Sequence, residues 1–422
     1  MKFIADFHLH SKYSRATSSQ MGLENLDKFA KIKGIKVLGT GDFTHPLWFK
    51  EIKEKLEPAQ EGLFKLKNSA SETRFILTSE ISCIYSKNYK VRKIHILVFA
   101  PSLEIVEKIN GYLSIVGNLK ADGRPILGLD AKELAKIVLN ISQDCLIVPA
   151  HLMTPWFSLF GSKSGFDSIE ECFEDYSKYI FAGETGLSAS PDMLWRMPDG
   201  RRITLISNSD AHSLSHLGRE ANVFDTELSY FTIKEAIKSK NPQKFLYTIE
   251  FFPEEGKYHY DGHRLCGVSL SPQESKKYNN ICPVCHKLLT IGVLNRVEQL
   301  ADKPEGFVPE GAIPFKRLVP LEEIIANVLN QKVGTIRVIQ EYQKLIKNFE
   351  NEFNVLIEVK RKDLEKVTLP EIVQGIINVR EGKVLAIPGY DGVYGKIEVL
   401  RNQNENLDNN KPLQQTLFLI CF

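Results

Sequence analysis

The sequence predicts an α/β protein with a β/α barrel over residues 1–255, a small module over 256–300 and a mainly helical domain over 301–400. In the first part, short apolar runs alternate with helical patterns, which is typical of β/α architecture with parallel strands. Most of these runs end in a polar side chain, and polar side chains at the carboxyl ends of strands are typical of a barrel. After residue 255 the apolar periodicity weakens, and it then returns with helical spacing.

Seven apolar runs are predicted as strands: 3–7, 36–40, 75–79, 94–100, 146–150, 179–183 and 203–207. The stretches between them include three predicted helices: 23–33, 131–140 and 232–239. Helical spacing also predicts three helices in the last domain: 321–330, 335–349 and 370–380. Residues 401–422 begin with a strongly polar stretch, so we predict a flexible tail there.

The composition is that of an ordinary globular protein, with 43% hydrophobic and 25% charged residues. A net charge of +2 is too balanced to indicate nucleic-acid binding by itself, so a DNA-binding face has to be local. No apolar run reaches the ~20 residues that a membrane span needs, and the N-terminus does not resemble a signal peptide. The seven cysteines are an odd number, which favours a reducing compartment. We therefore expect a cytoplasmic, nucleoid-associated protein without a membrane partner.

His8 and His10 are the first indication of a metal site. Alternate residues of a strand face the same side, so both imidazoles can reach one ion, although two surface histidines are the plain alternative. Five further residues stand at equivalent strand ends: Glu80, His95, His151, Asp210 and His212. Because this position recurs in separate segments, we predict a metal centre.

A second set of ligands lies in the small module. His263-x-x-Cys266 and Cys282-x-x-Cys285 are two chelating pairs with fifteen residues between them, a layout typical of a structural zinc site. His259 and His286 are alternatives to His263 as the fourth ligand. A redox Cys-x-x-Cys is the other interpretation, but no thioredoxin-like βαβ pattern surrounds it.

Several segments together resemble the motifs of the PHP (polymerase and histidinol phosphatase) superfamily: 6–11, 40–42, Glu80, His95, His151 and 209–212. The resemblance implies a distorted seven-stranded β/α barrel and a phosphoesterase centre with two or three metals. One metal would be held by four residues: His8, His10, Glu80 and Asp210. Glu80 would bridge to a second metal on His95 and His151, and His212 would face a third position.

The third position departs from the superfamily pattern. Asp42 stands where many members have a histidine, so we expect it as a metal ligand, with His45 as an alternative contributor. Another ligand common in the superfamily has no clear match near residues 14–17, which leaves occupancy of the third position open.

The chemistry expected from this resemblance is hydrolysis by a metal-activated water. Clustered divalent metals lower the pKa of a bound water and stabilise the oxygens of an in-line displacement at phosphorus. The expected cofactors are two or three ions of zinc, manganese or magnesium, of which zinc and manganese suit imidazole with carboxylate best, plus one structural zinc. The residues expected to be catalytic are His8, His10, Glu80, Asp210 and His212.

The order of the later motifs is more specific. A barrel followed by His-Arg-Leu-Cys, Cys-Pro-Val-Cys and Pro-Gly-Tyr-Asp-Gly-Val-Tyr-Gly resembles the endonuclease Q family of DNA repair enzymes over about residues 1–400. The resemblance implies cleavage of the phosphodiester 5′ to hypoxanthine, uracil, xanthine or an abasic site, with the lesion nucleotide extruded. The alternatives are a metabolite phosphomonoesterase, such as a histidinol phosphatase, and a non-catalytic DNA-binding factor.

Candidate DNA contacts come from two basic groups: Lys87, Lys90, Arg92 and Lys93, then Arg196, Arg201 and Arg202. Either group also fits a solvated face. Three aromatic residues nearby are expected to stack on bases or to pack in the core: Tyr85, Tyr89 and Trp195. Glu184 also ends a predicted strand, and it fits a base beside the metals, a substrate contact or a salt bridge at the barrel rim.

The tail carries a separate hypothesis. Gln414, Leu417 and Phe418 resemble the short peptides that dock on DNA sliding clamps. The alternative is a tail that packs on its own domain.

Overall fold

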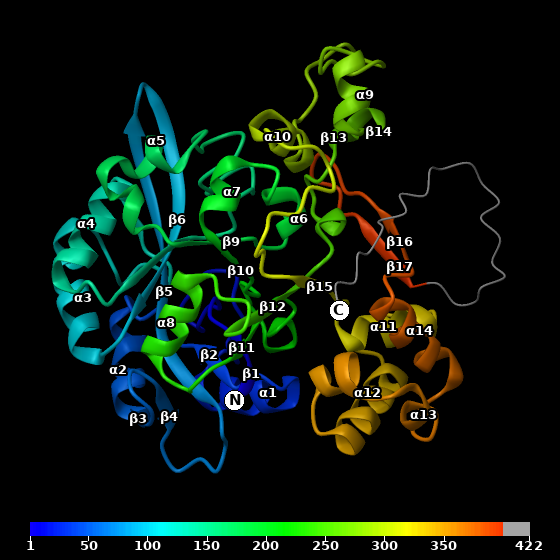
Figure 1. The fold of residues 1–422 in the computed structure, drawn as a ribbon, viewed down its shortest axis with the longest axis horizontal. Helices are drawn as coiled ribbons and strands as arrows, with labels where there is room; N and C mark the ends of the chain where they lie inside the picture. The colour runs from blue at the N-terminus through cyan, green and yellow to red at the C-terminus, as the bar shows by residue number, and fades with distance from the viewer. Residues whose placement is uncertain (400–422) are drawn as a thin grey trace. The chain divides into compact units, whose positions relative to one another are not determined.

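The structure is a computed structural model that describes residues 1–399, and it is of the α/β class (Figure 1). Its main sheet contains a continuous path of hydrogen-bonded strands. In spatial order they are β12 (Phe245–Glu250), β11 (Ala221–Asp225), β1 (Lys2–Asp6), β2 (Val37–Gly39), β5 (Arg74–Lys87), β6 (Lys90–Ala100) and β8 (Leu146–Pro149). Two further strands, β9 (Ala182–Glu184) and β10 (Thr204–Ile206), form a separate parallel pair.

The sheet is mixed, which corrects the expectation of parallel strands throughout. β1, β2 and β5 are parallel, but β11 is antiparallel to β1, and β6 is antiparallel to β5 and β8. The smaller strands are β3 (Leu56–Pro58), β4 (Phe64–Leu66), β7 (Ile126–Leu127) and β15 (Phe315–Arg317). The parallel strands still end at one edge of the sheet, and that edge carries the site described below.

The physical reason for the antiparallel part is a tight turn. β5 runs for 14 residues and reverses through Asn88 and Tyr89 into β6. Both turn residues have positive φ, 54° and 58°, as a two-residue type I′ hairpin turn requires. In Figure 1 this hairpin is the long cyan pair that extends away from the rest of the sheet. The polar sequence at its tip made the two strands resemble separate elements.

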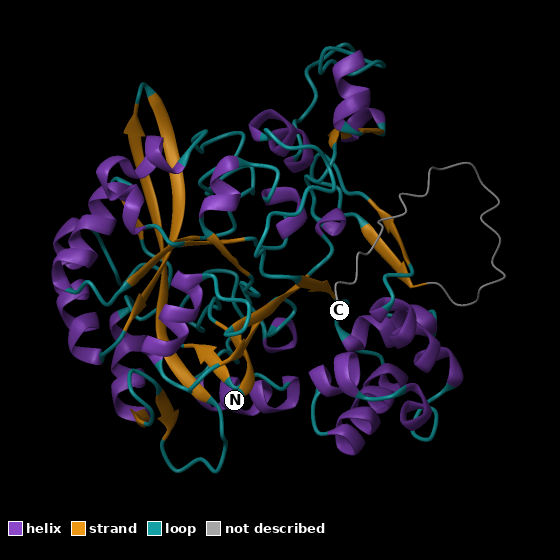
Figure 2. Cartoon of the chain, viewed as in Figure 1, coloured by secondary structure: helices purple, strands orange, loops and turns teal. Residues whose placement is uncertain are grey.

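The helices around the sheet match their predicted positions closely (Figure 2). α1 (Leu23–Lys33) has the predicted bounds and ends at Gly34, whose φ of 90° suits a left-handed cap. α4 (Ala131–Ile141) and α8 (Tyr230–Ser239) begin behind Asp130 and Ser229, whose side chains accept hydrogen bonds from backbone N–H groups of the first turn. The others are α2 (Pro46–Lys55), α3 (Leu103–Val116), α5 (Ile169–Phe173), α6 (Pro191–Leu194) and α7 (Pro198–Arg202).

An aromatic core holds the strands in place. Phe7 contacts Phe99 edge to face, with ring centroids 5.4 Å apart, and Phe224 stacks on Phe245 at 4.6 Å. All four side chains are buried. Because Phe7 is the residue before His8 and the packing on both sides is tight, the start of the first motif is held rigidly.

The cysteine-rich segment belongs to the same compact unit as the sheet, which comprises residues 1–316 and 388–396. It contains β13 (Asp261–His263), β14 (Val268–Leu270), α9 (Pro272–Lys277) and α10 (Val293–Leu300). Buried Asp261 joins these elements by accepting hydrogen bonds from Gly292 N (2.6 Å), Asn295 Nδ2 (2.5 Å) and Ser275 Oγ. The late turn returns to this segment, since Asp391 accepts hydrogen bonds from Thr290 Oγ1 and Arg264 N, both at 2.7 Å.

The second compact unit is mainly helical and, within the described residues, comprises 317–387 and 397–399. Its elements are α11 (Leu321–Val328), α12 (Ile336–Phe349), a π-helix (Asn354–Glu358), α13 (Arg361–Leu364), α14 (Pro370–Arg380), β16 (Val384–Ile387) and β17 (Lys396–Val399). None of the described helices is long and apolar enough to cross a membrane. The clamp-binding residues predicted in the tail, Gln414, Leu417 and Phe418, lie outside the described residues.

Tyr89 yields a stability prediction. A non-glycine residue in the left-handed region costs about 1–2 kcal/mol, whereas glycine loses about 0.4–1 kcal/mol through the greater freedom of the unfolded chain. The side chain is fully exposed, so removing it loses no packing. We therefore expect Tyr89→Gly to raise the free energy of unfolding by roughly 0.5–1 kcal/mol. Tyr89→Ala keeps the backbone strain and is the matched control. A Tyr89→Gly protein that melts below Tyr89→Ala would contradict the assignment of the turn.

Candidate metal centre

The first group of candidate ligands gathers at the carboxyl ends of the parallel strands. His8 and His10 follow β1, Glu80 lies on β5, and Asp210 follows β10. One ligand atom from each lies within 4.8 Å of the others. The Nε2 atom of His10 is 3.1 Å from Asp210 Oδ1 and 3.3 Å from Glu80 Oε2. These four residues are those that the sequence predicts for one metal.

Backbone pairing explains why distant segments meet here. Leu9 and Ala211 form a parallel β-bridge, and His10 N donates a hydrogen bond to Ala211 O at 2.9 Å. The His8-x-His10 and Asp210-x-His212 segments therefore lie side by side, although about 200 residues separate them in the sequence.

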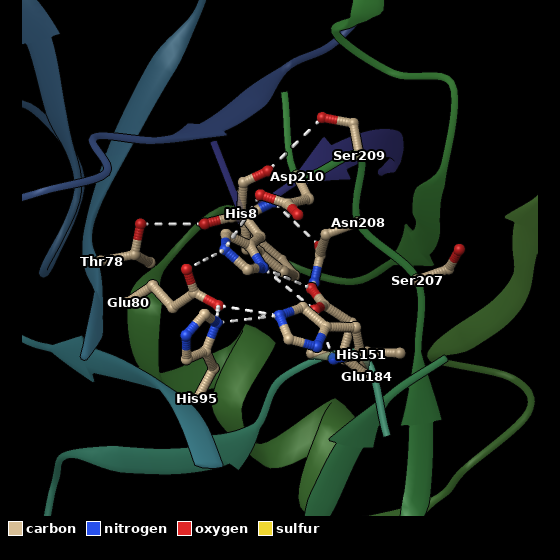
Figure 3. Close-up of polar contacts among 12 residues, drawn as sticks. His8, Thr78, Glu80, His95, His151, Glu184, Ser207, Asn208, Ser209 and Asp210 are labelled. Atoms are coloured by element: carbon tan, nitrogen blue, oxygen red, sulfur yellow. Dashed lines mark hydrogen bonds and ion pairs between the residues drawn. The ribbon is translucent and has the colours of Figure 1, made fainter. Parts of the chain in front are cut away.

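A second group shares Glu80 with the first. Glu80 Oε1 is 2.7 Å from His95 Nδ1 and 3.0 Å from His151 Nε2, and the three residues form one candidate cluster. Figure 3 shows Glu80 facing His8, His95 and His151. Because Oε2 faces the first group and Oε1 the second, Glu80 has the geometry of a bridging carboxylate.

The donor atoms fit divalent metals. Among the described residues, His8 Nε2, His10 Nε2 and Asp210 Oδ1 are buried without a hydrogen-bond partner, and buried polar atoms are rarely left so. They converge with Glu80 as a set of imidazole nitrogens and carboxylate oxygens, which suits zinc or manganese.

Glu184 supports His8 from behind. It is completely buried, and both its carboxylate oxygens are 3.0 Å from His8 Nδ1. It also accepts hydrogen bonds from Asn208 Nδ2 and His151 N, both at 2.9 Å. Because the carboxylate is buried and bonded to His8, Asn208 and His151, it lies behind His8 and does not form the expected salt bridge at the rim. It orients the imidazole and raises its basicity.

Asp42 supports His10 in the same way. Its carboxylate accepts hydrogen bonds from His10 Nδ1 (3.0 Å), Ser11 N (2.6 Å), Ser11 Oγ (2.7 Å) and Ser14 Oγ (2.9 Å). It lies outside both ligand groups. The structure thus places Asp42 behind a predicted ligand and not among the ligands, and His45 is turned to stack on Tyr13 at 4.5 Å.

His212 is also outside the two groups. Its Nδ1 atom is 2.9 Å from the carbonyl oxygen of Asp210, and its ring lies 4.5 Å from that of His10. It lies at the mouth of the centre, with 28% of the side chain exposed.

The electrostatics favour bound cations. Burial raises the pKa of Glu80, but His95, His8 and Arg124 outweigh burial and hold it well below its usual value. Burial lowers the pKa of His95 to about 4 despite the opposing charge of Glu80. His95 is therefore neutral near pH 7, as a metal-binding imidazole must be. Burial disfavours protonated His8, yet Glu184, Glu80 and Asp210 together raise its pKa well above the ordinary value.

The four residues predicted to bind a structural zinc also meet. His263, Cys266, Cys282 and Cys285 form one group with ligand atoms within 4.8 Å of one another, and Cys285 Sγ is 3.5 Å from His263 Nδ1. His259 and His286, the alternatives for the fourth ligand, are not in this group.

Most of the basic residues that were predicted to contact DNA are bonded to other groups of the protein. Arg92 is buried, donates a hydrogen bond to Gly165 O and lies 4.0 Å from the Phe166 ring centroid. Arg196 is buried and forms an ion pair with Glu298 at 2.7 Å. For these two arginines the expectation of a phosphate contact is wrong, because their charged groups are already bound inside the protein.

The remaining cations have looser attachments. Arg202 forms ion pairs with Asp199 (3.2 Å) and Glu170 (3.5 Å), Arg201 with Asp302 (2.7 Å), and Lys87 with Glu174 (2.7 Å). Lys93 lies over the ring of Phe157. Lys90 is exposed near the hairpin tip.

Of the three aromatic candidates, two are fixed in the interior. Tyr85 hydrogen-bonds with the thiol of Cys172, and Trp195 packs against Phe315 with only 7% of its surface exposed. Tyr89 differs, because its side chain is completely exposed.

Sequence reasoning missed two residues of the centre. Arg124 Nη1 donates a hydrogen bond to Glu80 Oε2 at 3.1 Å. Asp6 accepts hydrogen bonds from Ser209 N and Gly218 N, and burial raises its pKa to about 6 even though these bonds lower it. Arg124 lies in an irregular loop without periodicity, so nothing in the sequence pattern marked it.

The support from Glu184 gives a testable prediction. Carboxylates behind a metal-binding histidine typically contribute 10–100-fold to metal affinity, so we expect Glu184→Gln to weaken binding at the first group by about that factor. The measurement is competition with a chelator. The matched control is Glu220→Gln, because burial and the charge of Glu250 raise the pKa of Glu220 well above its usual value and the amide mimics its neutral form. Equal affinity in the Glu184→Gln and wild-type proteins would contradict the role.

Comparisons with known proteins identify relatives of this chain. A family model, the MJ0043 C-terminal domain, matches residues 320–383. The uncharacterized protein MJ0043 of Methanocaldococcus jannaschii is 36% identical over 253 residues, which cover 58% of this chain and 31% of that protein. The chain thus spans about a third of the length of that relative.

Two solved structures are similar along almost the whole chain. The lesion-specific endonuclease PfuEndoQ from Pyrococcus furiosus is 32% identical with a TM-score of 0.84, covering 94% of this chain and 96% of that one. Endonuclease Q in complex with a 27-mer duplex substrate, with an abasic lesion at its active site, is 32% identical with a TM-score of 0.83 and covers 95% and 97%. At this identity and coverage, the chain belongs to the endonuclease Q family of nucleases.

Proposed function

We propose that this protein is a DNA repair endonuclease that hydrolyses the phosphodiester 5′ to a deaminated base (hypoxanthine, uracil or xanthine) or an abasic site. The observation that carries the proposal is Glu80, one buried carboxylate shared by two groups of ligands. Metal pairs of this kind supply an activated water and stabilise the charge of a phosphate under attack. The similar endonuclease Q holds an abasic lesion at its active site, which supports a damaged duplex as the substrate.

The proposal assigns each part of the chain a task. Residues 1–255 would form the distorted seven-stranded PHP barrel, 256–300 a zinc-binding module and 301–400 a C-terminal helical domain. Within the barrel, Glu184 and Asp42 hold His8 and His10 in fixed orientations. The two imidazoles would therefore reorganise little when negative charge develops on the phosphate during the reaction. His212, at the mouth, would meet the substrate. Clamp binding by the tail stays a prediction.

A cleavage assay tests the proposal directly. Duplexes with one hypoxanthine, uracil or abasic site should be nicked once, 5′ to the lesion, with manganese, magnesium or zinc present, and an unmodified duplex should stay intact. Asp210→Asn removes a candidate ligand without a large change of volume, so we expect the rate to fall by at least ~10²-fold. Release of phosphate from histidinol phosphate with intact DNA would replace the proposal by a metabolite phosphatase.

We also infer that the tip of the β5–β6 hairpin contacts the duplex several base pairs away from the lesion. Residues 85–93 carry four basic residues and no acidic one. Arg92 is bound inside the protein and Lys87 pairs with Glu174, so Lys90 is the cation that the tip presents. At the tip, Tyr89 and Lys90 are exposed, and Val91 is 57% exposed. Tyr89 also keeps an unfavourable backbone conformation while its ring lies entirely in solvent. Strain of this kind often marks a functional contact, and an aromatic ring beside a cation suits DNA.

Strand geometry gives the distance between this contact and the metal centre. Glu80 lies seven residues before Lys87 on the same strand, which corresponds to about 23 Å. DNA rises by about 3.4 Å per base pair, so a duplex that ran along the hairpin would meet the tip roughly 7 base pairs from the nick.

We therefore expect Tyr89→Ala and Tyr89→Gly to weaken binding on the order of tenfold, but only for duplexes that extend well beyond this point. Binding should be measured with short and long lesion duplexes under identical salt, since the electrostatic contribution depends on it. Tyr112→Ala, at another exposed tyrosine, is the control. The two Tyr89 variants differ in expected stability, so a loss shared by both would not reflect misfolding. Equal loss on short and long duplexes would rule out a contact at the predicted distance.

A further inference from the structure

We propose that Arg124 binds the scissile phosphate, and that its guanidinium takes the third cationic position of the centre in place of a metal ion. This inference rests on the proposed function, because it assigns the phosphate of that substrate to one residue. It starts from a cation that lies among candidate metal ligands.

The loop that carries Arg124 is held firmly against both ligand groups. Gly123 N donates a hydrogen bond to Tyr13 O (3.0 Å), and Gly123 O accepts one from Thr44 Oγ1 (3.2 Å). Ser82, on the same strand as Glu80, donates its N–H to Pro125 O at 3.0 Å. The backbone N–H of Arg124 itself bonds Asp122 Oδ1 at 3.1 Å. The position of Arg124 is therefore set by the strand that presents the bridging carboxylate.

Gly123 shows how closely this loop approaches the centre. A Cβ atom at this residue would lie 2.3 Å from Asp42 Oδ2 and 2.3 Å from Ser14 Oγ, so no larger residue fits without displacing them. The carboxylate that orients His10 therefore also packs against the residue before Arg124. One loop thus serves both the ligand geometry and the placement of the guanidinium.

The guanidinium has donors left for a ligand. Its single side-chain hydrogen bond among the described residues goes from Nη1 to Glu80 Oε2, the oxygen that also lies 3.3 Å from His10 Nε2. A guanidinium offers five N–H donors in a planar fork that matches two oxygens of a phosphate. The side chain is 27% exposed, whereas Glu80 is buried, so part of Arg124 is accessible from solvent beside the buried carboxylate.

The residues expected at a third metal are directed elsewhere. Asp42 is bound to His10, Ser11 and Ser14, and the Nδ1 atom of His212 faces the carbonyl oxygen of Asp210. The described residues at this end of the sheet form two candidate metal groups, and the module adds one. Arg124 places a positive charge 3.1 Å from the carboxylate of Glu80.

The test compares Arg124→Ala and Arg124→Lys with Arg15→Ala. Arg15 is the matched control, because it is 74% exposed and pairs with Asp122 of the same loop without contacting a ligand. Three quantities are measured on the full chain: metal content by elemental analysis, the rate on a lesion duplex, and the rate on a chromogenic phosphodiester. The affinity of each protein for the uncleaved lesion duplex is measured in the presence of a chelator, which prevents cleavage and so separates binding from chemistry.

We expect about three metal ions per chain in the wild type and in Arg124→Ala, one for each candidate group. Both cleavage rates of Arg124→Ala should fall by about 10²–10³-fold, with weaker DNA binding in the chelator. Arg124→Lys should recover only part of the loss, because an ammonium cannot form the bidentate contact. Arg15→Ala should stay within about threefold of the wild type.

Three results would overturn the inference. A fourth metal in the wild type would show that a third ion occupies the centre. If Arg124→Ala lost both its bound metal and its activity, Arg124 would only position Glu80. An unchanged rate on both substrates would exclude a phosphate contact. A wild type that cleaves the chromogenic ester but no lesion duplex would instead refute the proposed function, and the ester rates would still decide the role of Arg124.

Discussion

The arrangement of the whole centre depends on one buried carboxylate, that of Glu80. Its two oxygens face two different sets of histidines, so Glu80 is the residue that two bound metals would share. A buried charge of this kind is tolerated only when cations surround it. The nearby histidines and Arg124 lower its pKa, and bound metals would complete the compensation. Other residues at this end of the sheet hold the histidines and Arg124 in place around Glu80.

A second layer of carboxylates provides that rigidity. Asp42 and Glu184 each bind the Nδ1 atom of a histidine and leave the Nε2 atom pointing to the centre. Asp6, the last residue of β1 and two residues before His8, holds the backbone of the loop that carries Asp210. Because an imidazole bound on one side can turn little, the site is organised before any ion or substrate arrives.

The β5–β6 hairpin connects the centre to the surface. The same two strands carry Glu80 and His95 near their middle and Tyr89 at their tip. The long hairpin cannot shift its register without moving both ligands, since a slip of one residue would turn their side chains to the opposite face. This coupling is what the proposed function would require, because the reacting phosphate and the flanking duplex would have to be held in fixed positions relative to each other.

The sequence by itself determined the α/β class, the bounds of helices such as 23–33 and 370–380, and the candidate ligands that are related by local spacing. His8 and His10 are found from alternation along one strand, and the cysteine pairs from their spacing, because these relations involve neighbours in the chain. Tertiary structure alone decided that Asp42 and Glu184 lie behind the histidines, that Arg92 and Arg196 are bound inside, and that Arg124 reaches Glu80. Glu184 is 176 residues from His8, and Arg124 is 44 from Glu80. Contacts at such separations arise from strand pairing and loop packing, which leave no periodic pattern in the sequence.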